Sequence, residues 1–442
     1  MMDFAGPEFQ GPAPISSDHR TLTTPRCHKM RPMCDFQLQY LRLIRLMTLF
    51  LFLLTLTCVW PAHAQRLEIG RPSEVGMSSS RLAVLDQVIV ESIAEEETPG
   101  AVLLVARRGK IVYRKAFGLR AVEPTQEERT HGSIFDVASL TKVMATAGSV
   151  MALVEDGKLV LTRPVGDYIP EFSRRGKERV RVVDLLTHFS GLRPDLDLDV
   201  PWVGYDRAIE LACRERLLDD PGAAFVYSDI NYFLLGDIVQ RVSGVGLDEF
   251  ATQRIFRPLG MHDTSFRPDR AKLSRIVPTE RRDGVMLRGE VHDPTAARMG
   301  GVAGHAGVFS TADDTAAWAQ MLLNSGVYND TQVLSPLSVR KMVTSQAPGG
   351  SFDLRGFGFD IDTRFSRNRG DLFPVGSFGH TGFTGTSVWI DPETETLVVL
   401  FTSRVHPRGR GNVVGLRSRV ASVVAASILD VDAFGKGVAG GR

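Results

Sequence analysis

The stretch FDVASLTK, residues 135–142, decides the fold, because it opens a long helix with an apolar core face and so begins the helical part of the chain. Within it, Ser139 and Lys142 stand three positions apart, and residues at this spacing lie on one face of a helix. A serine hydroxyl is a poor nucleophile until a neighbour takes its proton. A lysine can do this when desolvation or nearby cations lower its pKa from about 10.4. The stretch therefore predicts an activated serine at a helix N-terminus, whose field and free N–H groups favour an oxyanion.

The same spacing occurs a second time, at Ser338 and Lys341. This pair follows Ser335-Pro336 in the polar start of a helix, where a capped surface helix is the simpler interpretation. The spacing alone therefore does not identify a nucleophile.

Strand patterns lie near both ends of the chain, on either side of the helical part. Four strands and two terminal helices are predicted there: strands at 101–106, 110–117, 386–390 and 396–402, and helices at 78–96 and 413–429. Arg108-Gly109 is a turn signal that makes the first two strands a hairpin. The economical arrangement is an α+β fold, in which one antiparallel sheet is built from both ends and flanked by the terminal helices. A mostly helical subdomain is inserted, and the cleft beside it is the expected site.

The apolar, uncharged run at residues 46–60 predicts a secretory signal peptide. Arg42 and Arg45 precede it, and Ala62-His63-Ala64 supply a small-x-small cleavage site. The run is shorter than the ~20 residues that span a bilayer as a helix. We expect an exported, periplasmic or secreted protein whose leader is cleaved; the alternative is membrane association through an uncleaved leader.

The leader before this run is long and partly acidic, so we expect translation to start at an internal methionine such as Met30 or Met33. Five segments follow from these patterns: a leader and signal peptide at 1–64, the first part of the α/β domain at 65–138, the helical subdomain at 139–345, the second part of the α/β domain at 346–430, and a tail at 431–442.

Composition excludes several classes of function. The net charge of +1 gives no field that would favour nucleic acid, and no dinucleotide or phosphate-binding fingerprint follows a strand. The histidines show no metal-ligand spacing, so neither a metal nor another cofactor is expected. Cys213 is the single cysteine after the leader, so no internal disulfide is expected, and its apolar neighbours predict a core position.

Two later elements offer groups that fit the serine and lysine. The first, Tyr227-Ser228-Asp229, puts a phenol where a loop meets an apolar helix, and a phenol beside a charged lysine can relay a proton. The second, His380-Thr381-Gly382, precedes a strand and offers an imidazole, a hydroxyl and a backbone without a Cβ. Taken separately, each has a simpler interpretation, as a helix cap with a packed tyrosine and as a glycine turn with an exposed histidine.

In this order the three elements resemble the penicillin-recognising serine hydrolases, in the branch of class C β-lactamases, D-alanyl-D-alanine carboxypeptidases and related esterases. That family carries S-x-x-K, then Y-x-N, then [KH]-T-G. Further similar stretches are LLTHFSGL at 185–192, FRPLGM at 256–261 and GHAGVFST at 304–311. The resemblance covers about residues 76–429 and implies a β-lactamase/transpeptidase-like fold.

The resemblance also implies roles for the matching residues. Ser139 would attack a carbonyl and become acylated, with Lys142 as the base and Tyr227 shuttling the proton with it; which of the two is the base is disputed for such sites. The oxyanion hole would consist of the backbone N–H groups of Ser139 and Phe383, the residue after Gly382. Thr381 and His380 would hold a substrate carboxylate or polarise the phenol of Tyr227.

This sequence departs from the family pattern at two positions. Asp229 replaces an asparagine, and an ionised aspartate cannot donate to a substrate amide. It can instead pair with Lys142, which would raise the lysine pKa and keep the amine charged. His380 replaces the more common lysine, and a neutral imidazole exerts a weaker field on Tyr227, so we expect activity to fall as the pH drops through the histidine range.

These departures favour peptide or ester hydrolysis over β-lactam turnover. The leading hypothesis is a D-alanyl carboxypeptidase-like enzyme acting on small-molecule or peptide substrates of cell-wall type. The alternatives are an esterase on small acyl esters, a β-lactamase, and a penicillin-binding sensor that is acylated without turnover. Arg404, just after the last strand, is a lesser candidate for binding a substrate carboxylate, with a surface salt bridge as the simpler interpretation.

Overall fold

The computed structural model describes residues 67–431, so the predicted signal peptide and most of the tail lie outside the described residues. Its main sheet contains strands from both ends of the chain, as expected. Along the sheet the order is β1 (Glu68–Ile69), β3 (Lys110–Ala121), β2 (Gly100–Arg107), β16 (Thr396–Thr402), β15 (Thr386–Asp391), β14 (Phe378–Thr381), β13 (Asp360–Asp362) and β12 (Leu354–Arg355). The central strands are antiparallel, while β1 at the edge pairs parallel with β3.

The β2–β3 hairpin has a two-residue turn in which Arg108 (φ 48°) and Gly109 (φ 75°) both have positive φ. A turn of this kind matches the right-handed twist of the two strands. On the other side of β2, the strand β16 pairs with it in register, with Phe401 opposite Val102. This pairing joins the N-terminal and C-terminal parts of the chain into one sheet.

Both faces of the central strands are buried, because helices cover each of them. On β2, Leu103 and Val105 face the terminal helices α2 (Ser79–Leu82), α3 (Val84–Ala94) and α12 (Val414–Ala426). The alternate residues, Val102 and Leu104, belong to the larger core on the opposite face. The helix predicted at 78–96 is two helices that meet at Ala83, and the first begins with Ser78, whose side chain accepts from Arg81 N.

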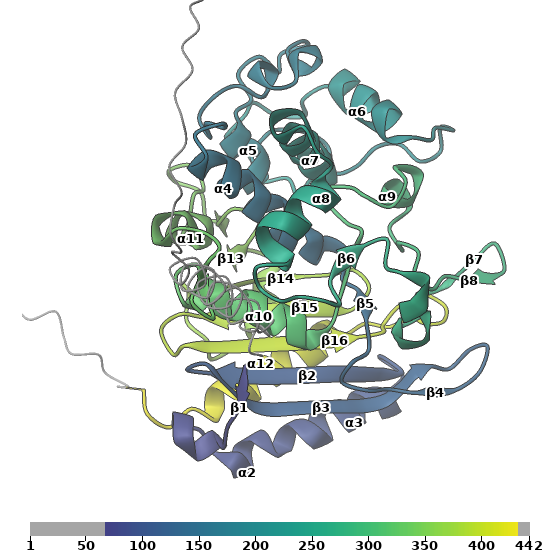
Figure 1. The fold of residues 1–442 in the computed structure, drawn as a ribbon, viewed down its shortest axis with the longest axis vertical. Helices are drawn as coiled ribbons and strands as arrows, with labels where there is room; N and C mark the ends of the chain where they lie inside the picture. The colour runs from purple at the N-terminus through teal and green to yellow at the C-terminus, as the bar shows by residue number, and fades with distance from the viewer. Residues whose placement is uncertain (1–66, 432–442) are drawn as a thin grey trace, which may run out of the picture. The chain divides into compact units, whose positions relative to one another are not determined.

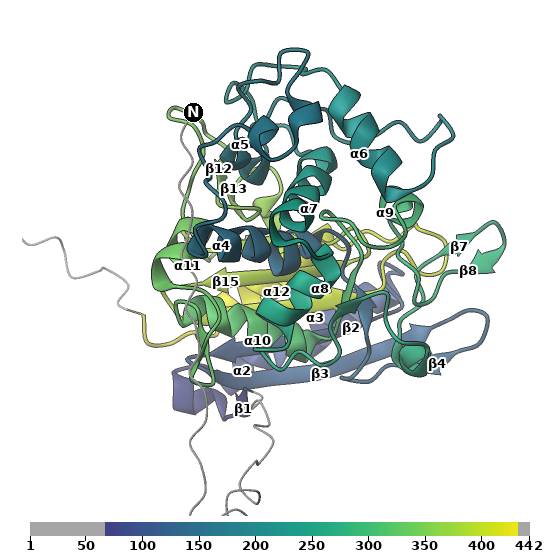
Figure 2. The same ribbon diagram turned by 45° about the horizontal axis from the view of Figure 1, so that its top comes forward.

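The larger core lies between the sheet and the remaining helices. Helix α10 (Ala312–Leu323) packs directly on β2 and β16, although it falls in the segment predicted as the inserted helical part. Above it in Figure 1 are α4 (Gly148–Glu155), α5 (Val182–Thr187), α6 (Tyr205–Arg214), α7 (Asp229–Ser243) and α8 (Leu247–Ala251). Figure 2, turned by 45°, keeps α4, α5 and α7 on this side of the sheet. The segments that carry the candidate site come together where these helices meet β14.

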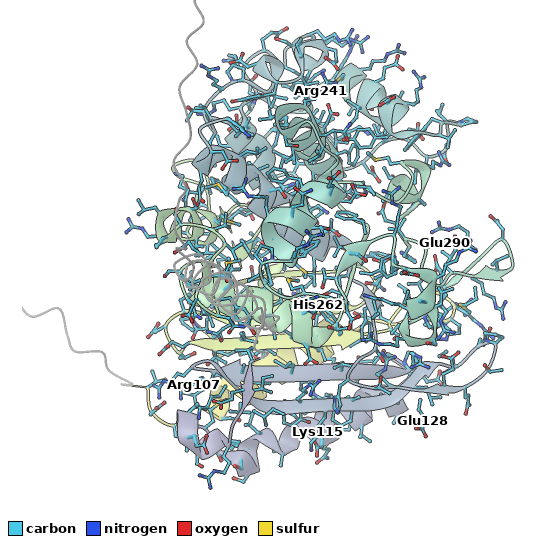
Figure 3. All side chains as sticks on the ribbon, viewed as in Figure 1. Arg107, Lys115, Glu128, Arg241, His262 and Glu290 are labelled. Carbon is cyan, nitrogen blue, oxygen red and sulfur yellow. The ribbon has the colours of Figure 1, made fainter. Side chains whose placement is uncertain are left out.

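Charged side chains are mostly distributed around the periphery, as Figure 3 shows for Lys115, Arg241 and Glu290. Arg107 is an exception, because its side chain is buried at the end of β2 and donates to the carbonyl of Val75 and to Asp430. It thereby ties an N-terminal loop to the chain segment after α12. Cys213 is buried, as expected. Within residues 67–431, no helix combines the length and apolar character needed to cross a membrane.

Candidate active site

The segment that carries Ser139 is not the continuous α-helix that its pattern predicted. Ala138–Leu140 forms a 3-10 turn, Lys142–Ala147 is a π-helix, and only from Gly148 does α4 run as an α-helix. Ala138, directly before Ser139, has φ of 48°, a left-handed conformation that is strained for a residue with a Cβ. Despite this irregular winding, Lys142 and Ser139 still face each other, because their side chains are hydrogen-bonded.

Lys142 is completely buried, and its amine has three close oxygen partners. Nζ lies 3.0 Å from Ser139 Oγ, 3.0 Å from the carbonyl oxygen of His305 and 2.7 Å from Asp229 Oδ1. The first two contacts are hydrogen bonds donated by the amine, and the third is an ion pair. The ion pair with Asp229, expected from the substitution at that position, is therefore present in the structure.

These contacts decide the charge of Lys142. Burial by itself lowers the lysine pKa, but the Asp229 carboxylate and the Tyr227 phenol outweigh it and raise that pKa above its ordinary value. At neutral pH the group is therefore an ammonium ion. In that form it cannot take the proton of Ser139, although it can stabilise negative charge on a neighbouring oxygen.

Tyr227 lies two residues before the start of α7, at the loop–helix joint that its sequence position predicted. Its phenol lies beside Lys142 and Ser139, which both act to lower its pKa, and Lys142 Nζ lies 5.0 Å from the centre of its ring. The ring stacks on His188, with centroids 4.5 Å apart, and it also contacts Phe365. The phenol is therefore held by contacts on the ring as well as on the hydroxyl.

Burial raises the pKa of Tyr227, whereas the charge of Lys142 acts to lower it. Because the phenol and the amine interact strongly, they titrate as a unit. The pair can accept the proton of Ser139 once it has lost one proton of its own. That form can be written as phenolate with ammonium or as phenol with amine.

The end of β14 lies against the Ser139 segment. A Cβ on Gly382 would stand 2.4 Å from the carbonyl oxygen of Val137, so only glycine allows this approach. Next to it, the hydroxyls of Thr384 and Thr386 donate to the carbonyls of Asp136 and Val137. Within the described chain the Phe383 N–H has no hydrogen-bond acceptor, so it is free to serve an oxyanion as the family resemblance implies.

His380 is buried, with 2% of its surface exposed, which corrects the alternative of an exposed histidine in a glycine turn. Its Nδ1 lies 2.8 Å from the carbonyl oxygen of Thr381, and its ring centre is 6.0 Å from that of Tyr227. Burial, with the charges of Arg355 and Lys142, holds its pKa well below 6.5. The imidazole is neutral across the ordinary histidine range, so a fall in activity through protonation of His380 requires a pH below the range first expected.

Several groups at the site carried no distinctive sequence signal. His188 stacks on Tyr227, and the backbone carbonyl of His305 accepts from Lys142. The His305 ring pairs with Asp293, at 2.8 Å, which raises the histidine pKa despite burial. The stretches LLTHFSGL and GHAGVFST pointed to these positions without indicating what they contact.

Arg404 lies against Phe383, the residue after Gly382. Its guanidinium lies 4.1 Å from the centre of the Phe383 ring, and it donates to the Phe383 and Gly411 carbonyls. The guanidinium therefore supports the Phe383 loop, and both of these hydrogen bonds go to backbone carbonyls.

These residues define a class of protein: a hydrolase with a serine, lysine and tyrosine centre. No cluster of three or more histidine, cysteine or acidic side chains suited to a metal ion occurs in residues 67–431. The chain belongs to the beta-lactamase family, whose model matches residues 85–420.

Among its relatives, an Escherichia coli K12 protein named "Putative D-alanyl-D-alanine carboxypeptidase" is 33% identical over 394 residues, covering 81% of this chain and 90% of the relative. A Bacillus subtilis protein named N-acetylmuramyl-L-alanine amidase is 33% identical over 367 residues, covering 74% of this chain and 82% of the relative. A solved penicillin-binding protein homolog from Caulobacter crescentus has a TM-score of 0.65 at 21% identity, covering 80% of this chain and 99% of that chain. The fold is thus β-lactamase/transpeptidase-like, as the resemblance implied.

Proposed function

We propose that this hydrolase forms an acyl-enzyme at Ser139 and acts as a D-alanyl carboxypeptidase-like enzyme on peptides of cell-wall type. The observation that carries the proposal is the 3.0 Å contact between Lys142 Nζ and Ser139 Oγ, with the Tyr227 phenol beside both groups. The names of the Escherichia coli and Bacillus subtilis relatives support a cell-wall substrate. We also propose export, on the strength of the apolar run at 46–60 alone.

In the proposed reaction, Ser139 Oγ attacks the substrate carbonyl carbon and its proton passes to the Tyr227–Lys142 pair. The oxyanion that forms is stabilised by the N–H groups of Ser139 and Phe383. The pair then returns the proton to the leaving amine or alcohol as the carbonyl reforms. Water repeats the sequence on the acyl-enzyme, which releases the acid and restores Ser139.

An esterase is the second candidate, and a specific contact favours it. Asp229 is occupied by Lys142 at 2.7 Å, and a carboxylate has no N–H to offer to a substrate amide. Esters need less assistance to the leaving group than amides and are less affected by this loss. One structural relative is titled as a family VIII carboxylesterase, with a TM-score of 0.63 at 18% identity, covering 80% of this chain and 99% of that chain.

A substrate panel separates the candidates, with the purified protein and its Ser139→Ala variant assayed in parallel. We expect steady release of D-alanine from a peptide ending in D-Ala-D-Ala, which requires Ser139. Turnover of nitrophenyl esters alone would indicate the esterase, and rapid turnover of a β-lactam would indicate a β-lactamase. A stable stoichiometric penicillin adduct without turnover of any substrate would indicate a sensor.

Replacing Asp229 with asparagine is expected to move the acidic limb of the pH profile of kcat/KM to lower pH by about one unit or more. The negative charge of Asp229 stabilises the fully protonated Tyr227–Lys142 pair, so its removal makes loss of the first proton easier. The active form is then populated at lower pH. The measurement is nitrophenyl ester hydrolysis between about pH 4 and 9, a range that spans the titration of carboxyl and histidine groups.

Asp237→Asn is the matched control, because Asp237 lies on the same helix and pairs with Arg241 at 2.8 Å. It should leave the position of the limb unchanged. An unshifted profile in Asp229→Asn would show that the carboxylate does not control the protonation of the pair.

A further inference from the structure

Asp136 is a buried carboxylate whose two oxygens are both used by backbone N–H groups. Oδ1 accepts from Ala138 N at 2.8 Å, and Oδ2 accepts from His292 N at 2.7 Å. The side chain is 2% exposed, and within residues 67–431 no lysine or arginine forms an ion pair with it. Burial raises its pKa, against the two N–H donors that favour the charged form. Burying a carboxylate without a cation is costly, so this position needs an explanation beyond packing.

The first of these hydrogen bonds controls the backbone before Ser139. Ala138 has φ of 48°, and its N–H is held by the carboxylate two residues earlier. The peptide that follows Ala138 carries the Ser139 N–H. The bond to Asp136 therefore stabilises a strained conformation that sets the direction of one proposed oxyanion donor.

The second bond leads to the other donor. The ring of His292 stacks on that of Phe383, with centroids 5.7 Å apart and an angle of 23°. Arg404 lies over the same ring, and Thr384 donates to the Asp136 carbonyl at 2.7 Å. Phe383 is thus held by contacts on its ring, at its carbonyl and through the next residue, Thr384. Two of these contacts, through His292 and through Thr384, lead to Asp136.

We propose that Asp136 is a positioning residue for the oxyanion hole, and that its carboxylate and carbonyl hold the Ser139 and Phe383 segments in register. The proposal rests on the proposed function at Ser139. Asp136 does not touch the substrate and acts through the backbone of Ala138 and through His292 and Thr384. Preorganised donors stabilise the transition state more than the bound substrate, so misplacing them lowers kcat and leaves KM nearly unchanged.

The test is Asp136→Asn, which keeps the size of the side chain but turns an NH2 group toward a backbone N–H. We expect kcat for nitrophenyl acetate to fall by about 100-fold, as for donors displaced by about 1 Å, with KM changed by less than about threefold. Affinity for phenylboronic acid, whose adduct with the serine mimics the tetrahedral intermediate, should fall with kcat. The control is Asp391→Asn, at the far end of β15, where a buried carboxylate accepts from Thr394 N. It should alter stability but neither kcat nor inhibitor affinity.

A folded Asp136→Asn enzyme with wild-type kcat and boronate affinity would overturn the proposal. If that variant does not fold, the test is Thr384→Val, which removes only the hydroxyl that donates to the Asp136 carbonyl. A fall in kcat of about threefold or more at unchanged KM supports the proposal. An unchanged kcat overturns it. The Ser139→Ala enzyme distinguishes failure of the proposed function from failure of the positioning role. If it keeps full activity, the proposed function itself fails, whereas loss in Ser139→Ala with normal Asp136→Asn refutes only the positioning role.

Discussion

Replacing Ser139 with alanine is expected to abolish covalent labelling by a fluorophosphonate and to lower kcat for ester hydrolysis by about 10⁴-fold or more. The loss is large because the remaining groups have no oxygen from which to form the acyl-enzyme. Lys142 and Tyr227 would stay in place, since Ser139 supplies only one of the contacts of each. The measurements are gel fluorescence after labelling and initial rates with nitrophenyl acetate.

Ser338→Ala is the matched control, because it removes the serine of the other S-x-x-K match. Its N–H bonds to Ser335 Oγ, which caps α11 (Pro336–Val343), and Lys341 on that helix is exposed. The structure thus agrees with the capped helix predicted for this match. Labelling and hydrolysis should be unchanged in Ser338→Ala. Full labelling of Ser139→Ala would mean that a different residue is the nucleophile.

The two S-x-x-K matches illustrate how far a local pattern predicts a site. The pattern puts Ser139 and Lys142 on one face of a turn in any helical winding, so their proximity could be predicted. The pairing of Asp229 with Lys142 could also be anticipated, because Asp229 puts a negative charge where the family pattern has an asparagine, and Lys142 is the cation of that pattern. Such inferences succeed where the interaction depends on residue type and on a few positions of spacing.

Other features of the site depend on contacts between segments far apart in the chain. The Ser139 segment winds as a 3-10 turn followed by a π-helix, and Asp136 binds the N–H of Ala138 at its start; helical propensity predicts neither feature. Lys142 also donates to the backbone carbonyl of His305. Because every residue has a backbone carbonyl, the sequence does not indicate this contact. The low pKa of His380 requires its burial and the distant charge of Arg355. The sheet was simpler to predict, because alternation and length mark its strands directly.

Replacing Tyr227 with phenylalanine is expected to lower the rate of acylation by about 10²- to 10⁴-fold while leaving the fold intact. Lys142 is held as an ammonium ion by its interactions with Asp229 and Tyr227, so the proton of Ser139 needs the phenol as its first acceptor. Phenylalanine keeps the stacking on His188 and the contact with Phe365, which are made by the ring. The measurement is the burst of nitrophenol in the first turnover, with thermal unfolding as the test of folding.

Tyr113→Phe is a suitable control, because Tyr113 is also buried and donates its hydroxyl to a carboxylate, Asp86. It lies in the core under the terminal helices, on the face of the sheet away from Ser139. Its loss should reduce the free energy of unfolding by about 2 kcal/mol, as for a hydrogen bond to a charged group, with no change in the burst. If Tyr227→Phe acylated at the wild-type rate, Lys142 would have to accept the proton of Ser139 directly. The contacts with Asp229 and Tyr227 that raise its pKa would then have to weaken when substrate binds, so the ion pair with Asp229 would belong only to the free enzyme.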